Sequence, residues 1–186
     1  QAAPQRPAGY VDGRPLVLFV GRLQARKRVD ALLRVCAALP EGEQPEVWII
    51  GDGPERDALE ALAETTYDRV RFHGALHGPE LAPLFSRADL FVLPGTGGLA
   101  VQEAMFYGLP VIVAEADGTQ SNLVREENGW VVPAGDDAAL REAIQSALAA
   151  PARLREMGAE SFRIVSEEIN LEAMAAVFRR AVKAIW

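Results

Sequence analysis

Short apolar runs recur along this chain, and segments with the periodicity of a helix separate them. A run that is apolar at every position is typical of a strand buried on both faces, as in a parallel sheet. The intervening segments place their apolar residues on one face of a helix. The alternation therefore predicts an α/β fold in which helices cover a parallel sheet. The six predicted strands span residues 16–20, 47–50, 70–72, 90–93, 111–113 and 130–132, and all of them except 70–72, which contains Arg71, are apolar throughout.

The connections between these strands favour one topology. Handedness and connection rules lead to a doubly wound, Rossmann-like parallel sheet of six strands in the order 3-2-1-4-5-6. The first and fourth strands are neighbours at the switch point of such a sheet, where ligands bind beyond the carboxyl ends of the strands. The loops that follow residues 16–20 and 90–93 are therefore predicted to meet.

The chain divides into a short leading segment and one domain. Residues 1–14 are rich in Ala, Pro and Gly and predict a linker. Residues 15–186 have a length that suits one domain. Asp136 or Asp137 is expected to cap the helix after the sixth strand, and further helices are expected at about 151–166 and 171–186.

Composition excludes several classes of protein. The net charge of −7 argues against a nucleic-acid partner. No apolar run approaches the ~20 residues of a membrane span, and the first residues lack the apolar core of a signal peptide. A cytoplasmic location without a transmembrane segment is expected, with peripheral membrane association of a longer chain left open. The single cysteine, Cys36, excludes an internal disulfide and is expected to be a buried thiol.

The stretch from Leu90 to Ala114 carries one charged residue, Glu103, in otherwise apolar and glycine-rich sequence. Its pattern predicts a strand, a tight turn, a helix and a further strand. The turn brings backbone N–H groups to a helix N-terminus, which suits an anion such as phosphate, and its glycines would let the backbone approach a ligand. An unpaired carboxylate is costly to bury, so Glu103 is expected to have a function.

The loop after the first strand is basic. Its Arg22 and Lys27 could neutralise a diphosphate, while the backbone of residues 97–100 donates to the same group. Glu103 could accept hydrogen bonds from the vicinal hydroxyls of a ribose. The predicted ligand is thus a nucleotide joined through a diphosphate to another group. The alternatives are a solvated basic loop and a carboxylate that only complements the helix dipole.

Other motifs are weaker. The turn Gly95-Thr96-Gly97-Gly98 does not match the dinucleotide fingerprint, and the chain has no Walker sequence. His73 and His77 lack nearby cysteines or a carboxylate pattern, so no metal site is predicted. The three tryptophans are expected in the core or in an interface; they are Trp48, Trp130 and Trp186.

The order and spacing of several motifs resemble a known family, the retaining glycosyltransferases of family 4. The resemblance is to their C-terminal, donor-binding domain, which is one half of the two-domain GT-B architecture, and it covers nearly all of the chain after Pro15. The motifs are Phe19-Val20-Gly21-Arg22-Leu23 with Lys27, Gly51-Asp52-Gly53-Pro54, Val70-Arg71-Phe72-His73-Gly74, Ala88-Asp89-Leu90-Phe91-Val92-Leu93-Pro94, Gln102-Glu103-Ala104-Met105 and Gly108-Leu109-Pro110-Val111.

This resemblance implies a nucleotide-diphospho-sugar donor and transfer of its sugar to an acceptor with retention, mostly without a catalytic metal and with no cofactor. Arg22 and Lys27 would be catalytic, since they would stabilise the charge on the leaving diphosphate. Glu103 would hold the ribose, and Leu76 would lie near the base. The remaining donor-binding residues would be Gly21, Gly97, Gly98, Leu99 and Ala100.

The chain departs from the family in two ways. The family has a first glutamate, eight positions before the one matched by Glu103, that contacts the donor sugar; Gly95 stands there. The acceptor-binding N-terminal domain is also missing, so this domain alone is expected to be inactive. A non-catalytic nucleotide-binding or partner-binding module and one half of a nucleotide-sugar epimerase are the alternatives.

Overall fold

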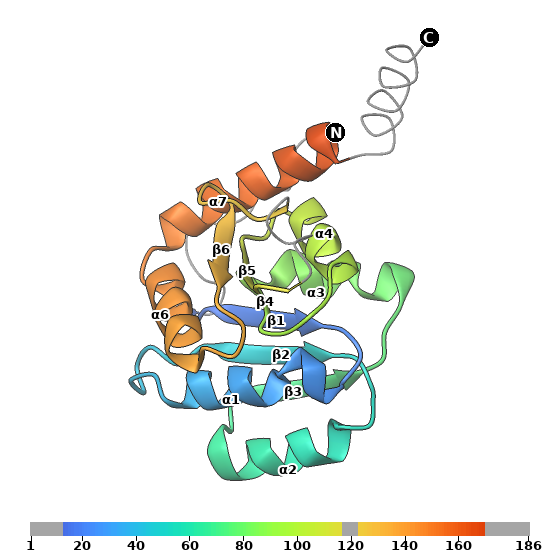
Figure 1. Ribbon diagram of the computed structural model, residues 1–186, viewed down its shortest axis with the longest axis vertical. Coiled ribbons are helices and arrows are strands. Elements are labelled where there is room, and N and C mark those ends of the chain that lie inside the picture. The colour runs from blue at the N-terminus through green and yellow to red at the C-terminus, as the bar shows by residue number, and fades with distance from the viewer. Residues whose placement is uncertain (1–12, 117–122, 170–186) are drawn as a thin grey trace.

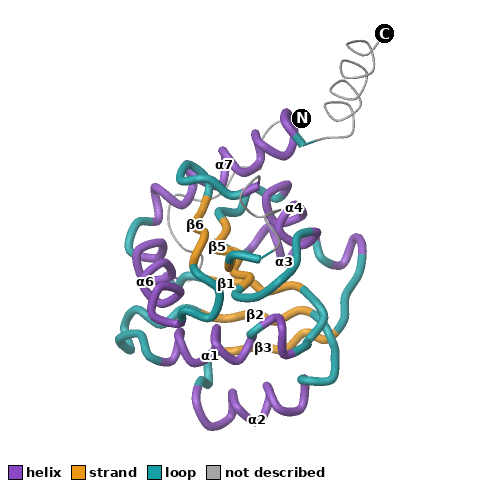
Figure 2. Tube along the Cα trace, viewed as in Figure 1, coloured by secondary structure: helices purple, strands orange, loops and turns teal. Residues whose placement is uncertain are grey.

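A twisted sheet of six parallel strands forms the centre of the domain and has the predicted order β3-β2-β1-β4-β5-β6. The computed structural model describes residues 13–116 and 123–169, and Figure 2 shows its strands surrounded by helices. The register aligns Val17 with both Val47 and Leu90, so β1 lies between β2 and β4. The strands are β1 (Leu16–Val20), β2 (Glu46–Ile50), β3 (Val70–Gly74), β4 (Leu90–Leu93), β5 (Val111–Ala114) and β6 (Gly129–Val132).

Helices cover both faces of this sheet, as right-handed crossovers require. On one face α1 contacts α2 and α6, whereas α4 contacts α7. Helix α7 runs across the β6 end of the sheet and also contacts α6 (Figure 1). The helices are α1 (Val29–Ala37), α2 (Arg56–Thr66), α3 (Ala82–Arg87), α4 (Leu99–Phe106), α6 (Asp137–Leu148) and α7 (Pro151–Arg163), with short helical turns η2 (Ala25–Lys27), η3 (Gly78–Glu80) and η4 (Ile164–Glu168).

The core follows from the apolar runs. Every residue of β4 and β5 is buried, as expected for strands covered on both faces. Full burial of one such Leu, Ile or Phe side chain contributes about 1.5–3 kcal/mol. Cys36 of α1 is buried as predicted, and burial raises the pKa of its thiol to about 12. Trp48 lies in the core, whereas Trp130 is partly buried.

Most helix boundaries agree with the sequence pattern. Asp136, and not Asp137, caps α6, because its carboxylate accepts a hydrogen bond from the backbone N–H of Ala139. The helix expected to continue to about Ser166 has α-helical geometry only to Arg163 and then becomes the π-helical turn η4. The helix predicted at 171–186 and most of the predicted linker lie outside the described residues.

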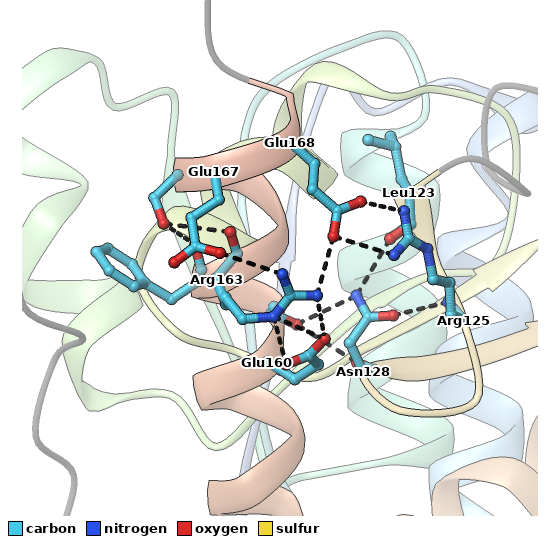
Figure 3. A network of polar contacts seen from close by, with 10 residues as sticks. Leu123, Arg125, Asn128, Glu160, Arg163, Glu167 and Glu168 are labelled. Carbon is cyan, nitrogen blue, oxygen red and sulfur yellow. Dashed lines mark hydrogen bonds and ion pairs between the residues drawn. The ribbon is translucent and has the colours of Figure 1, made fainter. Parts of the chain in front are cut away.

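Two polar clusters join α7 to the sheet. The buried carboxylate of Asp89 accepts hydrogen bonds from the backbone N–H of Leu16 (2.8 Å) and from the guanidinium of Arg155 (2.6 Å). Further along, Arg163 pairs with three carboxylates of α7 and η4, and Arg125 pairs with Glu168 (Figure 3). Together these contacts fix α7 against the start of β4 and the residues before β6.

Candidate functional site

The two loops at the switch point meet, as the topology predicted. The loop after β1 contributes Arg26 and Lys27, and the turn after β4 contributes Thr96. The Lys27 ammonium donates to the Thr96 carbonyl, and the Thr96 N–H donates to the Arg26 carbonyl at 3.2 Å. The Arg26 guanidinium also donates to the Thr96 hydroxyl at 2.9 Å. We call this set of hydrogen bonds the loop contact.

The glycines of the turn allow this loop contact. A Cβ atom on Gly95 would lie 2.1 Å from the Arg26 carbonyl oxygen, and one on Gly97 would lie 2.3 Å from the Lys27 ammonium nitrogen. Gly97 also has a φ of +143°, which favours glycine. The sequence predicted that these glycines admit a ligand. In the structure their immediate neighbours are Arg26 and Lys27 of the other loop.

A second close approach holds the other end of the basic loop. A Cβ on Gly51 would lie 1.9 Å from the Gly21 carbonyl oxygen, and one on Gly53 would lie 2.2 Å from the Leu23 carbonyl oxygen. The Leu23 side chain is fully buried, and its N–H donates to the Asp52 carbonyl at 2.9 Å. The loop after β1 is therefore anchored on both sides by glycine turns.

A cleft of about 430 Å³ opens beyond the carboxyl ends of β1, β2 and β3. It brings together three residues that the sequence assigned to the site, Gly21, Arg22 and Leu76. Asp52 and His77 also line it. Arg22 is exposed and Leu76 is partly buried, so the cleft offers a cation and an apolar surface to a ligand.

Helix α4 begins where the glycine turn ends. Gly98 occupies the N-cap position, and no side chain caps this helix end. Leu99 and Ala100 form the first turn, and the Leu99 side chain is 86% exposed. The start of α4 thus presents backbone N–H groups at the surface, where the helix dipole favours an anion.

Glu103 lies one turn further along α4 and is half-buried. Within the described part of the chain, its carboxylate accepts no hydrogen bond. Burial raises the pKa of this carboxyl group. On the facing loop, burial and the neighbouring Arg26 charge lower the pKa of Lys27. An anion that received a hydrogen bond from Lys27, and a hydroxyl that donated to Glu103, would each relieve one of these costs.

The histidines do not form a metal site among the residues that the structure describes, where no group of three or more His, Cys, Asp or Glu could hold an ion. His73 belongs to β3 and packs its ring against Trp48, with 4.8 Å between ring centroids. The pKa of His73 is lowered mainly by burial, and the positive charge of Arg71 lowers it further. Trp186 lies outside the described residues.

Two site residues were not identified from the sequence, namely Thr96 and the side chain of Arg26. They are 70 positions apart. The only available signal was the predicted convergence of their loops, and that signal identifies no particular pair. A larger hollow, of about 570 Å³, lies along β6 and contains none of the predicted site residues.

The sheet order and the paired loops at its switch point define a Rossmann-like α/β domain of the GT-B type. The chain belongs to the glycosyl transferases group 1 family, whose model matches residues 14–150. The solved sucrose-phosphate synthase of Thermosynechococcus elongatus superposes on 96% of the chain with a TM-score of 0.79 and 34% sequence identity. The chain covers 47% of that structure.

Relatives in sequence belong to the same class. A GDP-mannose-dependent alpha-mannosyltransferase of Mycolicibacterium smegmatis is 33% identical over 182 residues, which is 93% of this chain and 46% of that protein. An uncharacterized glycosyltransferase of Methanocaldococcus jannaschii is 34% identical over 139 residues, which is 72% of this chain and 36% of that protein. The chain therefore spans less than half the length of each of these relatives.

No helix among residues 13–116 and 123–169 has both the length and the apolar character needed to cross a membrane.

Proposed function

We propose that this chain is the donor-binding half of a glycosyltransferase that transfers a sugar of the hexose type from a nucleotide-diphospho-sugar, with retention. The donor would lie beyond the carboxyl ends of β1 and β4. Family membership and the GT-B type of fold support this assignment. The share of the mannosyltransferase that the chain covers, 46%, suits one half of such an enzyme.

The observation that carries the proposal is the Glu103 carboxylate. It is half-buried in α4, its pKa is raised by burial, and it accepts no hydrogen bond within the described part of the chain. Partial burial of a carboxylate that accepts no hydrogen bond from the protein disfavours its ionised form. Two ribose hydroxyls would donate to it and stabilise that form, because an ionised carboxylate can accept several hydrogen bonds.

The basic loop would bind the diphosphate. Arg22 borders the cleft at the end of β1, and Lys27 lies against the glycine turn that precedes α4. The N–H groups of Gly98, Leu99 and Ala100 would donate to the same phosphates. During transfer, Arg22 and Lys27 would stabilise the charge that develops on the leaving diphosphate, which is why we assign them a catalytic role.

The base would lie near Leu76, which shares a cleft with Gly21 and Arg22. The acceptor would bind to an N-terminal domain outside this chain, so the isolated domain would bind donor without transferring its sugar. The cytoplasmic location expected from the sequence stays a prediction.

Isothermal titration calorimetry with uridine, guanosine and adenosine diphosphates tests this function. At least one of them should bind weakly, and Glu103→Gln should weaken that binding by about 10- to 100-fold, as expected for a hydrogen bond to a charged group. Glu64→Gln, which changes an exposed carboxylate of α2, is the matched control. A folded chain that binds none of the three nucleotides would contradict the proposal.

A second candidate is a GT-B module that binds the nucleotide without catalysing transfer. The environment of Gly95 favours it, because the position of the family's first glutamate has no room for a side chain. Assays of the longer protein for donor hydrolysis and for sugar transfer separate the two. Tight nucleotide binding by a longer protein that neither hydrolyses the donor nor transfers its sugar would favour the non-catalytic module.

A further inference from the structure

The loop contact leaves Lys27 with a fixed position and with donors to spare. One N–H of its ammonium is used by the Thr96 carbonyl. An ammonium has three N–H donors, and residues 13–116 and 123–169 provide an acceptor for one of them, so two remain for a ligand. The carbonyl thereby orients a flexible side chain that would otherwise lose rotamer freedom on binding an anion.

Thr96 is itself held by Arg26. Its N–H donates to the Arg26 carbonyl at 3.2 Å, and its hydroxyl accepts a hydrogen bond from the Arg26 guanidinium at 2.9 Å. The same guanidinium donates through Nε to the Gln24 side chain at 3.0 Å, which fixes its plane. A chain of hydrogen bonds thus runs from Gln24 through Arg26 to Thr96, whose carbonyl accepts the hydrogen bond from Lys27.

Resting on the proposed function, we infer that Arg26 and Thr96 are positioning residues that hold Lys27 for the diphosphate of the donor. They act through Lys27 and need not touch the ligand. Gly95 stands where the family has its first glutamate, and there the turn packs closely against the Arg26 carbonyl of the basic loop.

The location of these side chains favours positioning over stabilisation of the fold. Both Arg26 and Thr96 are exposed. Exposed polar contacts contribute little to the free energy of unfolding. The basic loop keeps its course without them, because the buried Leu23 side chain and its hydrogen bond to Asp52 anchor it. Loss of the Thr96 hydroxyl should therefore change ligand affinity more than stability.

The test is a set of variants at position 96, titrated with the nucleoside diphosphate that the unchanged chain binds best. Thr96→Val keeps the volume of the side chain and removes the acceptor for Arg26, whereas Thr96→Ser keeps the hydroxyl. We expect Thr96→Val to weaken binding about three- to tenfold, the loss expected from about one hydrogen bond. Thr96→Ser should restore most of the affinity. Thr65→Val, at an exposed threonine of α2, is the matched control and should bind as the unchanged chain does.

A double-mutant cycle shows whether the effect passes through Lys27. In a Lys27→Ala background, Thr96→Val should have no further effect on affinity, and thermal unfolding of Thr96→Val should match that of Thr65→Val. Equal binding by the Thr96→Val variant and the unchanged chain would overturn this inference and leave the proposed function standing. Equal losses with and without Lys27 would also overturn it. If the unchanged chain binds no nucleoside diphosphate, the proposed function fails and this inference fails with it.

Discussion

A Cβ atom added to Gly95 would lie 2.1 Å from the carbonyl oxygen of Arg26. This distance is too short for any side chain, and Gly95 is buried. The neighbouring atoms are backbone atoms of Arg26 and Lys27, which cannot rotate away as a flexible side chain can. Gly95 is thus required by the packing of two loops, and the family's first glutamate could not occupy this position without moving one of them.

Substitution of Gly95 should therefore destabilise the protein and weaken nucleotide binding together. We expect Gly95→Ala to lower the free energy of unfolding by about 1–3 kcal/mol, the usual cost of overpacking. Gly95→Glu should lower it further and should not increase donor affinity. Chemical denaturation and calorimetry measure the two effects.

Gly42→Ala is the matched control for this prediction, because a Cβ on Gly42 would meet nothing within 4 Å. A Gly95→Ala protein as stable as Gly42→Ala would show that the turn moves away from Arg26 at little cost. That result would mean that the packing of the two loops does not require glycine at position 95.

Glu103 predicts a pH dependence of binding. Burial raises the pKa of this carboxyl group above the value of about 4.3 for an exposed glutamate, so protonation begins at a higher pH than usual. The ionised form accepts hydrogen bonds from a ribose, and hence affinity should fall as the pH is lowered through this raised pKa. Phosphate protonation near pH ~6 acts in the same direction.

A comparison with Glu103→Gln separates the two titrations. Protonation of the ligand affects both proteins equally and cancels in the ratio of their affinities. The pH dependence of this ratio therefore measures the ionisation of Glu103 alone. The advantage of the unchanged chain should shrink as the pH falls from about 7 to about 4.3, the ordinary pKa of an exposed glutamate, because the raised pKa of Glu103 lies above that value. A ratio that stays constant over this range would exclude an ionised Glu103 as a ligand-binding group.

Most of the sheet was predictable because its four central strands, β1, β2, β4 and β5, are buried on both faces. A run such as Leu90–Leu93 can be buried only as a central strand or a short piece of helix, and the helical periodicity on either side decides between them. Once six strands were recognised, the handedness of crossovers left one favoured order, which the structure confirms. The same reasoning brought the basic loop next to the glycine turn.

The contacts inside the site were not predictable in the same way. Periodicity says which residues are buried in a helix or strand, but it says nothing about which loop atoms touch. The partnership of Arg26 and Thr96 depends on the distance between two loops 70 positions apart. The sequence identified Gly95 as unusual for the family. The structure was needed to show that the Arg26 carbonyl leaves no room for a side chain there.

Asp89 should be among the most sensitive polar positions outside the site. It is 2% exposed, and its two oxygens accept from the Leu16 N–H and the Arg155 guanidinium. Asp89→Ala removes both acceptors, including the carboxylate that pairs with the largely buried guanidinium of Arg155, at a cost of about 3–5 kcal/mol in the free energy of unfolding. Asp89→Asn keeps an acceptor for Leu16 and should cost less.

The exposed pair of Asp30 and Arg34 provides the comparison. Asp30→Ala should change the free energy of unfolding by less than about 1 kcal/mol, since exposed ion pairs on a helix are weak. Urea denaturation of the three variants measures these differences. Similar losses for Asp89→Ala and Asp30→Ala would mean that the Asp89 pair does not hold α7 to the sheet.

Arg163 should govern part of the acid sensitivity of the fold. It pairs with Glu160, Glu167 and Glu168 at 2.7 to 3.2 Å (Figure 3). Hydrogen bonds from Arg163 lower the pKa of Glu160, and those from Arg125 and then Arg163 lower the pKa of Glu168. A carboxyl group whose pKa is lowered by folding stabilises the protein fully at a pH above about 4.3, its pKa in the unfolded chain. This contribution is lost as the pH falls through the lower pKa of the folded state.

Arg163→Gln should therefore lower the unfolding temperature at pH 7, and the difference from the unchanged chain should shrink steadily on acidification below pH ~4. Arg34→Gln, which loses one exposed carboxylate partner, should show a smaller difference at pH 7. Thermal unfolding followed by circular dichroism across this pH range measures both. If the Arg163→Gln difference is the same at every pH, the stabilisation comes from packing of the arginine side chain and not from its ion pairs, because packing does not depend on the ionisation of the three glutamates.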